Sequence, residues 1–98
     1  MDFDSPLFIH DKLELECDIY LRSEQVLYSV KWYKDDKEFF VYFPLENRAT
    51  RLYPMRGIHF DTPTYSHINN SLFVWLKNIN LDSQGIYQCE VSTDAPGE

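Results

Sequence analysis

The sequence predicts an all-β fold in which two antiparallel sheets are joined by one disulfide. Trp32 follows Cys17 by 15 residues, and Cys89 follows Cys17 by 72. Gly85, Tyr87 and Cys89 are each separated by two positions. Since side chains alternate along a strand, Tyr87 and Cys89 share one face. A cysteine on each sheet, with a tryptophan covering the bridge between them, accounts for this order.

This order of residues is typical of an immunoglobulin-like β-sandwich with Greek-key connections. The long gap between the cysteines leaves room for the additional strands of the variable type. We expect residues 1–98 to form one such domain, with strands A to F present and the chain truncated before strand G. Strand F would then be an open edge at which two copies could dimerise. The predicted core residues are Trp32, Tyr87, Leu15, Val74 and Leu76.

Composition limits the class of protein. A chain of 98 residues can bury one modest core. Its net charge of −7 argues against nucleic-acid binding and against attraction to anionic membranes. No apolar run approaches the roughly 20 residues of a membrane span. The two cysteines predict a single disulfide and therefore an extracellular location, secreted or at the cell surface; two reduced thiols in a cytosolic domain are the less favoured alternative.

Alternating apolar positions and turn residues divide the chain into strands. The expected strands are A at 3–9, B at 13–19, C at 26–34, C′ at 38–43, a C″ excursion within 44–56, D at 57–61, E at 72–79, and F from 85 with its end within 91–98. Residues 62–70 are expected to form a long polar loop before strand E.

The C′ segment is apolar on both faces, unlike the other predicted strands. Such a strand is covered on both sides or is meant to be covered by a partner. Either Phe40 with Tyr42 or Phe39 with Val41 would point outward. The predicted partner-binding residues are Lys31, Tyr33, Phe40, Tyr42, Gln88 and Glu90. Alternatively, the C′ aromatics pack under the C″ segment. Phe73 and Trp75 form a second apolar patch, which we expect to pack against strand A or a neighbouring domain.

No catalytic constellation is evident in the sequence. The three histidines lack metal-ligand spacing, no serine occupies a nucleophile elbow, and Asp35-Asp36 reads as a solvated turn. We therefore predict no enzyme activity, no metal and no cofactor. Asn69-Asn70-Ser71 is a sequon, which makes Asn69 a candidate glycosylation site.

Several blocks of the chain together resemble one family. They are 27–35, 38–40 leading to Tyr42 and Pro44, Gly57-Ile58 with Phe60-Asp61, Gly85 with Tyr87, and Cys89-Glu90-Val91-Ser92 followed by Ala95-Pro96. Over residues 13–96 the chain resembles the first immunoglobulin domain of the Beaten path (Beat) proteins. It departs at Val41, where the family tends to have a basic residue. Ser83 replaces the Asp of many variable domains, which places their Arg–Asp bridge in doubt.

The resemblance implies a secreted or cell-surface recognition module. Such proteins bind Sidestep-family immunoglobulin receptors through the sheet of strands C, C′, F and G, in axon guidance and synaptic matching. Two other functions remain open. The chain could be a structural spacer domain of an adhesion protein, for which a polar C–C′–F face and a shorter C-to-E gap are expected. It could also be a soluble immune-type binder, which shares the architecture.

Overall fold

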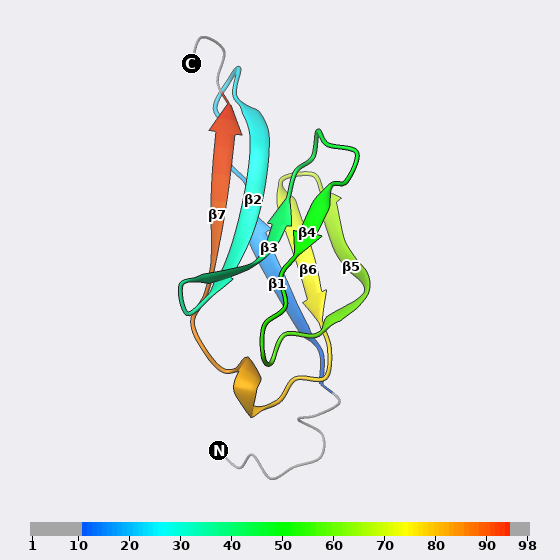
Figure 1. The fold of residues 1–98 in the computed structure, drawn as a ribbon. Coiled ribbons are helices and arrows are strands. Elements are labelled where there is room, and N and C mark those ends of the chain that lie inside the picture. The colour runs from blue at the N-terminus through cyan, green and yellow to red at the C-terminus, as the bar shows by residue number, and fades with distance from the viewer. Residues whose placement is uncertain (1–10, 95–98) are drawn as a thin grey trace. The chain divides into compact units, whose positions relative to one another are not determined.

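The computed structural model describes residues 11–94, which are all-β apart from one short 3₁₀ turn (Figure 1). The elements are β1 (Leu13–Asp18), β2 (Val26–Lys34), β3 (Lys37–Tyr42), β4 (Thr50–Leu52), β5 (Phe60–Ile68), β6 (Ser71–Leu76), the 3₁₀ turn η1 (Leu81–Ser83) and β7 (Tyr87–Asp94). The strands form two antiparallel sheets, ordered β1-β6-β5 and β4-β3-β2-β7. The chain divides into two compact units, each containing one sheet.

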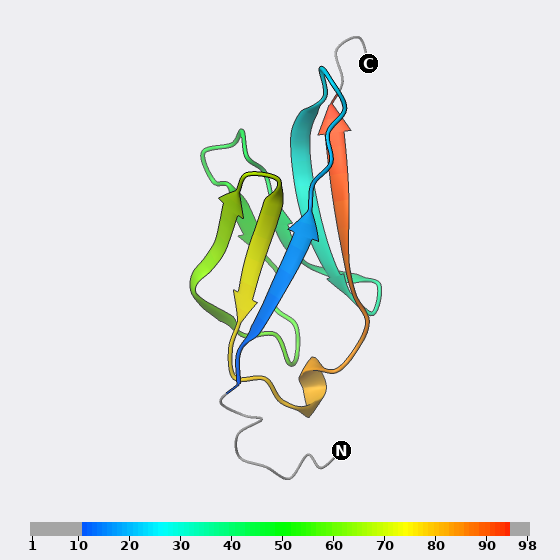
Figure 2. The same ribbon diagram turned by 180° about the vertical axis from the view of Figure 1, so that it is seen from behind.

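Of the described residues, the first unit comprises 11–18 and 54–85. In its sheet β6 lies between β1 and β5, as seen from behind in Figure 2. Leu72, Val74 and Leu76 of β6 are fully buried, while the residues between them are half-buried, because successive side chains of a strand point to opposite faces. Leu15 pairs with Val74 and Cys17 with Leu72, so the buried side chains of β1 and β6 lie on one face.

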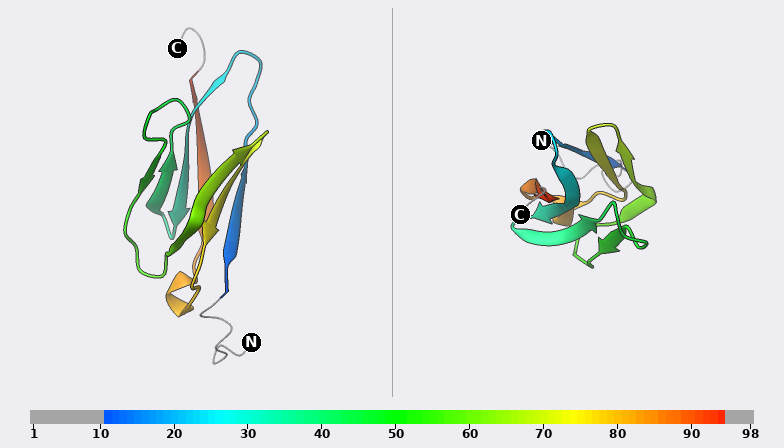
Figure 3. Two further views of the ribbon diagram at one scale, coloured as in Figure 1. Left: turned by 90° about the vertical axis from the view of Figure 1, so that its right-hand side faces the viewer. Right: turned by 90° about the horizontal axis from the view of Figure 1, so that it is seen from above.

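The expected long loop at 62–70 is wrong, because β5 continues to Ile68 and bends where its pairing with β6 is interrupted (Figure 3). Ile68 pairs with Ser71, which leaves only Asn69 and Asn70 as the turn. Asn69 has φ 52°, a left-handed conformation that asparagine tolerates. The polar character of this segment reflects a strand whose residues are all half-buried or exposed, rather than an irregular loop.

The second unit comprises residues 19–53 and 86–94 of the described chain. Its central strand, β2, pairs with β3 on one side and β7 on the other. Asp35 and Asp36 form the β2–β3 turn with φ of 50° and 67°. Positive φ at both central residues is the signature of a type I′ turn, whose twist matches that of the flanking strands. The expected C″ excursion contains only the three-residue strand β4, which pairs with β3.

The second unit differs from expectation in the register of β3. Trp32 pairs with Phe40 but Tyr33 pairs with Glu38, so Phe39 is an extra residue in β3. Strand β7 runs to Asp94, within the segment in which strand F was expected to end. It is an edge strand among the described residues. The expected strand A and the region of strand G lie outside residues 11–94, so the domain limits and dimerisation through this edge stay predictions.

The disulfide and the predicted core residues lie on these sheets. Cys17 and Cys89 are disulfide-bonded, and they are the only cysteines of the chain, so the bond links β1 to β7. Cys89 stands opposite Trp32 in the β2–β7 register. The other predicted core residues are mostly buried: Trp32 is 5% exposed, Leu15 8%, Val74 and Leu76 0%, and Tyr87 is half-buried.

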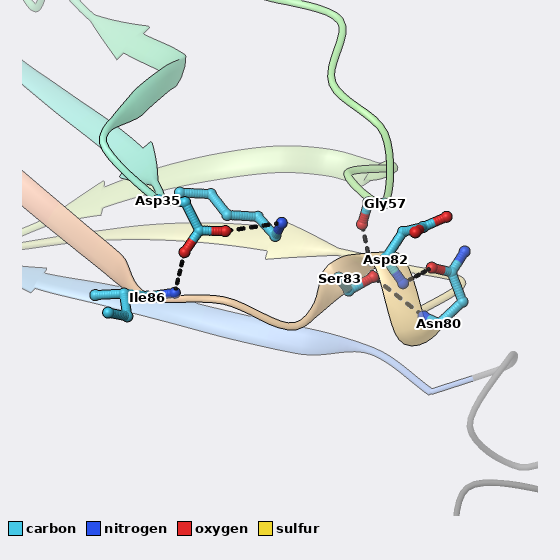
Figure 4. Close-up of polar contacts among 7 residues, drawn as sticks. Asp35, Gly57, Asn80, Asp82, Ser83 and Ile86 are labelled. Atoms are coloured by element: carbon cyan, nitrogen blue, oxygen red, sulfur yellow. Dashed lines mark hydrogen bonds and ion pairs between the residues drawn. The ribbon is translucent and has the colours of Figure 1, made fainter.

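A network of short polar contacts closes the η1 turn in the first unit (Figure 4). Asn80 Oδ1 accepts from the Asp82 N–H, and the Asn80 N–H donates to Ser83 Oγ, which is a reciprocal capping box. The buried Ser83 hydroxyl donates to the Gly57 carbonyl at 2.6 Å. In place of a close Arg–Asp bridge, Arg56 lies 4.0 Å from Asp82, and both side chains are exposed.

Candidate partner-binding face

The second unit presents an outward face on β2, β3 and β7, on the side opposite Trp32. Strand register assigns the residues to it, since cross-strand partners project to the same side of a sheet. Lys31 pairs with Glu90 and Val41, and Tyr33 pairs with Gln88 and Glu38. We call this set the β2-centred face: Lys31, Tyr33, Glu38, Val41, Gln88 and Glu90. Four of the six predicted partner-binding residues belong to it.

The other two predicted residues, Phe40 and Tyr42, do not lie on this face, and this part of the prediction is wrong. Phe40 pairs with Trp32 and Tyr42 pairs with Val30, so both rings lie on the buried side of the sheet. Phe40 is 0% and Tyr42 8% exposed. Sequence could not choose between the two possible outward pairs of β3, because every residue from 39 to 42 is apolar and the strand is buried on both faces.

Two diagonal contacts organise the polar residues of the face. The Tyr33 hydroxyl donates to Glu90 Oε1 at 2.8 Å, and Lys31 Nζ lies 3.7 Å from Glu38 Oε1. Tyr33 therefore joins an acid two positions from its direct β7 partner, Gln88. Lys31 joins an acid three positions from its direct β3 partner, Val41, because β3 contains one extra residue. Because the two diagonals run to opposite neighbours, β7 and β3 are both tied to β2 through side chains.

The contact with Glu90 changes the acidity of Tyr33. The hydrogen bond to Glu90 raises the pKa of Tyr33 to about 12, and burial and the negative charges of Glu90 and Glu38 act in the same direction. A carboxylate stabilises the neutral phenol, which is the donor, and opposes the phenolate. Tyr33 is thus a fixed neutral donor at physiological pH. In contrast, Gln88 beside it is exposed on the edge strand.

The turn that connects β2 to β3 is fastened to the start of β7. Asp35 Oδ1 accepts from the Ile86 N–H at 2.9 Å, and the Asp35 N–H donates to the Ile86 carbonyl at 2.8 Å (Figure 4). The Ile86 N–H, followed by Lys34, holds the pKa of Asp35 below its usual value of 3.8. All three strands of the β2-centred face are therefore fixed together at this end of the sheet.

Sequence analysis did not identify Arg51, which lies with two aromatic residues near the C-terminal end of β3. Arg51 of β4 pairs with Val41, which extends the β2-centred face by one strand. Its guanidinium lies 5.0 Å over the Phe43 ring, and Phe43 makes an edge contact with Tyr28, which is 53% exposed. The only available signal was three arginines among residues 44–56, and a sequence of this kind does not reveal the strand register of any one of them.

Between residues 11 and 94, no three His, Cys, Asp or Glu side chains are grouped so that they could hold a metal ion. In the same range no helix is long and apolar enough to cross a bilayer. The histidines predicted to lack metal-ligand spacing include His10, which lies outside this range.

A family model for the immunoglobulin domain matches residues 2–98, nearly the whole chain. The chain is an immunoglobulin-domain protein. No curated protein and no solved structure gives a match. The predicted fold class, an immunoglobulin-like sandwich, is confirmed by this match together with the two antiparallel sheets and the disulfide. Immunoglobulin domains are typically non-enzymatic modules for protein interaction or adhesion. An internal disulfide is typical of those outside the cell or at its surface.

The immunoglobulin domain has a second aromatic group, on the three-stranded sheet. Phe73 and Trp75 stack on the exposed side of β6, with ring centroids 6.1 Å apart. Trp75 Nε1 donates to Glu14 Oε1 at 2.9 Å, so its polar atom is already paired within the sheet. Both rings are half-buried, and Phe73 and Trp75 remain a second candidate contact surface.

Proposed function

We propose that this immunoglobulin domain is an extracellular recognition module whose β2-centred face binds another immunoglobulin-superfamily receptor of the Sidestep kind. The role in axon guidance or synaptic matching rests on the resemblance to Beat proteins. Lys31, Tyr33, Gln88 and Glu90 are the proposed contact residues, with Arg51 added from the strand register.

The proposal rests on one observation: polar side chains of this face are already held in place by contacts with one another. Tyr33 and Glu90 are held at 2.8 Å, Lys31 is paired with Glu38, and Gln88 is exposed on the edge strand β7 beside them. Tyrosine and arginine side chains are enriched in protein interfaces and among the residues that contribute most to binding. Side chains that are already ordered lose little conformational entropy on binding.

A spacer domain is the second candidate, and the burial of Phe40 and Tyr42 makes the face more polar than the sequence indicated. The diagonal contacts favour recognition over this alternative, because a spacer has no need of an ordered polar pattern on one sheet. An immune-type soluble binder would use the same architecture and differs only in its ligand.

The test is a binding screen in which the full chain is displayed as a multimer against Sidestep-like and other cell-surface ectodomains, since avidity reveals weak pairs. We expect a Sidestep-like hit. Gln88→Arg should weaken it by about tenfold or more, and Tyr33→Asp with Gln88→Arg should remove it. Circular dichroism melts would establish that both variants are folded.

Gln84→Arg is the matched control, because it makes the same chemical change at an exposed residue outside the four-stranded sheet. It should leave binding unchanged. Equal binding by wild type and both Gln88 variants would contradict the assignment of the face. A folded domain that binds no member of the panel would favour the spacer or the immune-type binder.

A further inference from the structure

We propose that Asn69 carries an N-linked oligosaccharide that is attached before β1 pairs with β6. Asn69-Asn70-Ser71 is the one Asn-x-Ser/Thr triplet of the chain with a middle residue other than proline. This inference is independent of the partner-binding proposal, because the triplet lies in the first unit and requires only passage through an oxidising, secretory compartment.

The position of the triplet leaves space for a bulky group. Asn69 and Asn70 are the two residues of the β5–β6 turn and are both exposed. The preceding residue, Ile68, is 53% exposed. An oligosaccharide attached at the tip of a hairpin projects into solvent without separating the paired strands.

The hydroxyl of the triplet is, however, engaged in the folded sheet. Ser71 Oγ lies 3.1 Å from Asp18 Oδ1 and 3.2 Å from Glu16 Oε2, to which its proton can be donated. Both acids belong to β1, and Asp18 is the direct cross-strand partner of Ser71. A transferase that recognises the serine hydroxyl must therefore act while β1 is still apart from β6.

The transfer needs only a lipid-pyrophosphate-linked oligosaccharide as donor. The side-chain amide nitrogen of Asn69 forms a bond to C1 of the terminal sugar, and the bond from C1 to the pyrophosphate oxygen breaks. The lipid pyrophosphate leaves with the electron pair, and the amide nitrogen loses one proton. No oxidation or reduction takes place.

The site is tested by secreting the full chain from eukaryotic cells and comparing intact masses before and after treatment with a peptide N-glycosidase. We expect a mass loss on treatment and conversion of Asn69 to aspartate. Asn69→Gln and Ser71→Ala should abolish the modification. Asn70→Gln is the matched control and should retain it, because the middle position is unrestricted apart from proline. A secreted wild-type chain without sugar would overturn the proposal.

The timing is tested in vitro with chain made in bacteria, an oligosaccharyltransferase and its lipid-linked donor, and a short sequon peptide to verify enzyme activity. One sample is folded with its disulfide intact, and the other is reduced, carboxymethylated and unfolded. Only the unfolded sample should be modified. Equal modification of the folded sample, or none of the unfolded one, would overturn the timing.

Discussion

The hydroxyl of Tyr33 on β2 donates a 2.8 Å hydrogen bond to the carboxylate of Glu90 on β7. The two residues are diagonal rather than directly paired, since Tyr33 stands opposite Gln88 and Glu90 stands opposite Lys31. The contact therefore connects the cross-strand pair Tyr33–Gln88 to the pair Lys31–Glu90, and it orders side chains on the outward face of β2 and β7.

Replacing Tyr33 with phenylalanine removes this link and keeps the ring. We expect Tyr33→Phe to lower the free energy of unfolding by about 1 kcal/mol, because a charge-assisted hydrogen bond at a half-buried site is lost. Urea denaturation at pH 7 measures the change. Tyr28→Phe, which removes a hydroxyl from a side chain that is 53% exposed, should change stability less.

The raised pKa of Tyr33 predicts alkaline behaviour. Because its pKa is about 12 in the folded chain and near 10 when unfolded, Tyr33 contributes stability that is complete below pH 10 and is lost as pH rises toward 12. The phenolate absorbance of folded wild type minus Tyr33→Phe should show one tyrosine titrating near pH 12. The subtraction is necessary because burial also raises the pKa of Tyr87. A difference curve with its midpoint near pH 10 would contradict the contact with Glu90.

Asp35 predicts the opposite pH dependence. Its pKa is lowered, chiefly by the Ile86 N–H, so its contribution is present above pH 3.8 and is lost as pH falls through the lowered value. Asp35→Asn keeps an acceptor and a residue suited to positive φ but removes the charge. The loss of stability between pH 5 and pH 2.5, measured with urea, should be smaller in this variant. Some loss of stability at low pH should remain in Asp35→Asn, because the pKa of Asp61 is also lowered, by the Thr62 N–H and Lys12.

The contact between Ser83 and Gly57 predicts two destabilised variants. Ser83→Ala removes the part-buried hydrogen bond from the Asn80 N–H and the buried one to the Gly57 carbonyl, and it should cost about 2 kcal/mol. Gly57→Ala should cost about 3 kcal/mol, because φ is +84° and a Cβ would collide with the Asp82 backbone. Thermal melts measure both. Ser23→Ala, at an exposed turn, is the control and should be near neutral.

Reduction of the disulfide should destabilise the domain by about 4 kcal/mol, given a bridge that spans 72 positions of the chain. Urea curves of the native and the reduced, alkylated chain measure the difference. Coincident curves would show that the bond contributes nothing to stability.

Sequence was sufficient where apolar residues recur at every second position, as in the inward series on β1 and β6. The bounds of β2 were also predicted, and the disulfide follows from the Cys17–Trp32–Cys89 spacing. Strand β5 was missed because most of its residues are polar, none is buried, and its turn has only two residues. A strand without a buried face lacks the pattern from which strands are recognised in a sequence.

Only part of the candidate face was predicted, because the amino-acid sequence does not reveal the pairing register of neighbouring strands. Trp32 was expected to face the core, so alternation along the strand placed its neighbours Lys31 and Tyr33 on the outward face. The same alternation around Cys89 placed Gln88 and Glu90 there. In β3 the extra residue, Phe39, shifts the pairing by one position. A one-residue shift moves side chains to the other face, so the wrong pair of aromatics was assigned to the surface. The pairing of Arg51 depends on that same register.

The two hairpins of residues 11–94 that have two-residue turns differ in their exposure to deamidation. Asn-Gly is strongly preferred in type I′ turns, and it is also the sequence most prone to deamidation. The β2–β3 turn uses Asp35-Asp36 instead, which carries no side-chain amide and no following glycine. The turn that anchors the start of β7 therefore has no amide to lose. The Asn69-Asn70 turn has two side-chain amides, and a sugar on Asn69 would block one of them.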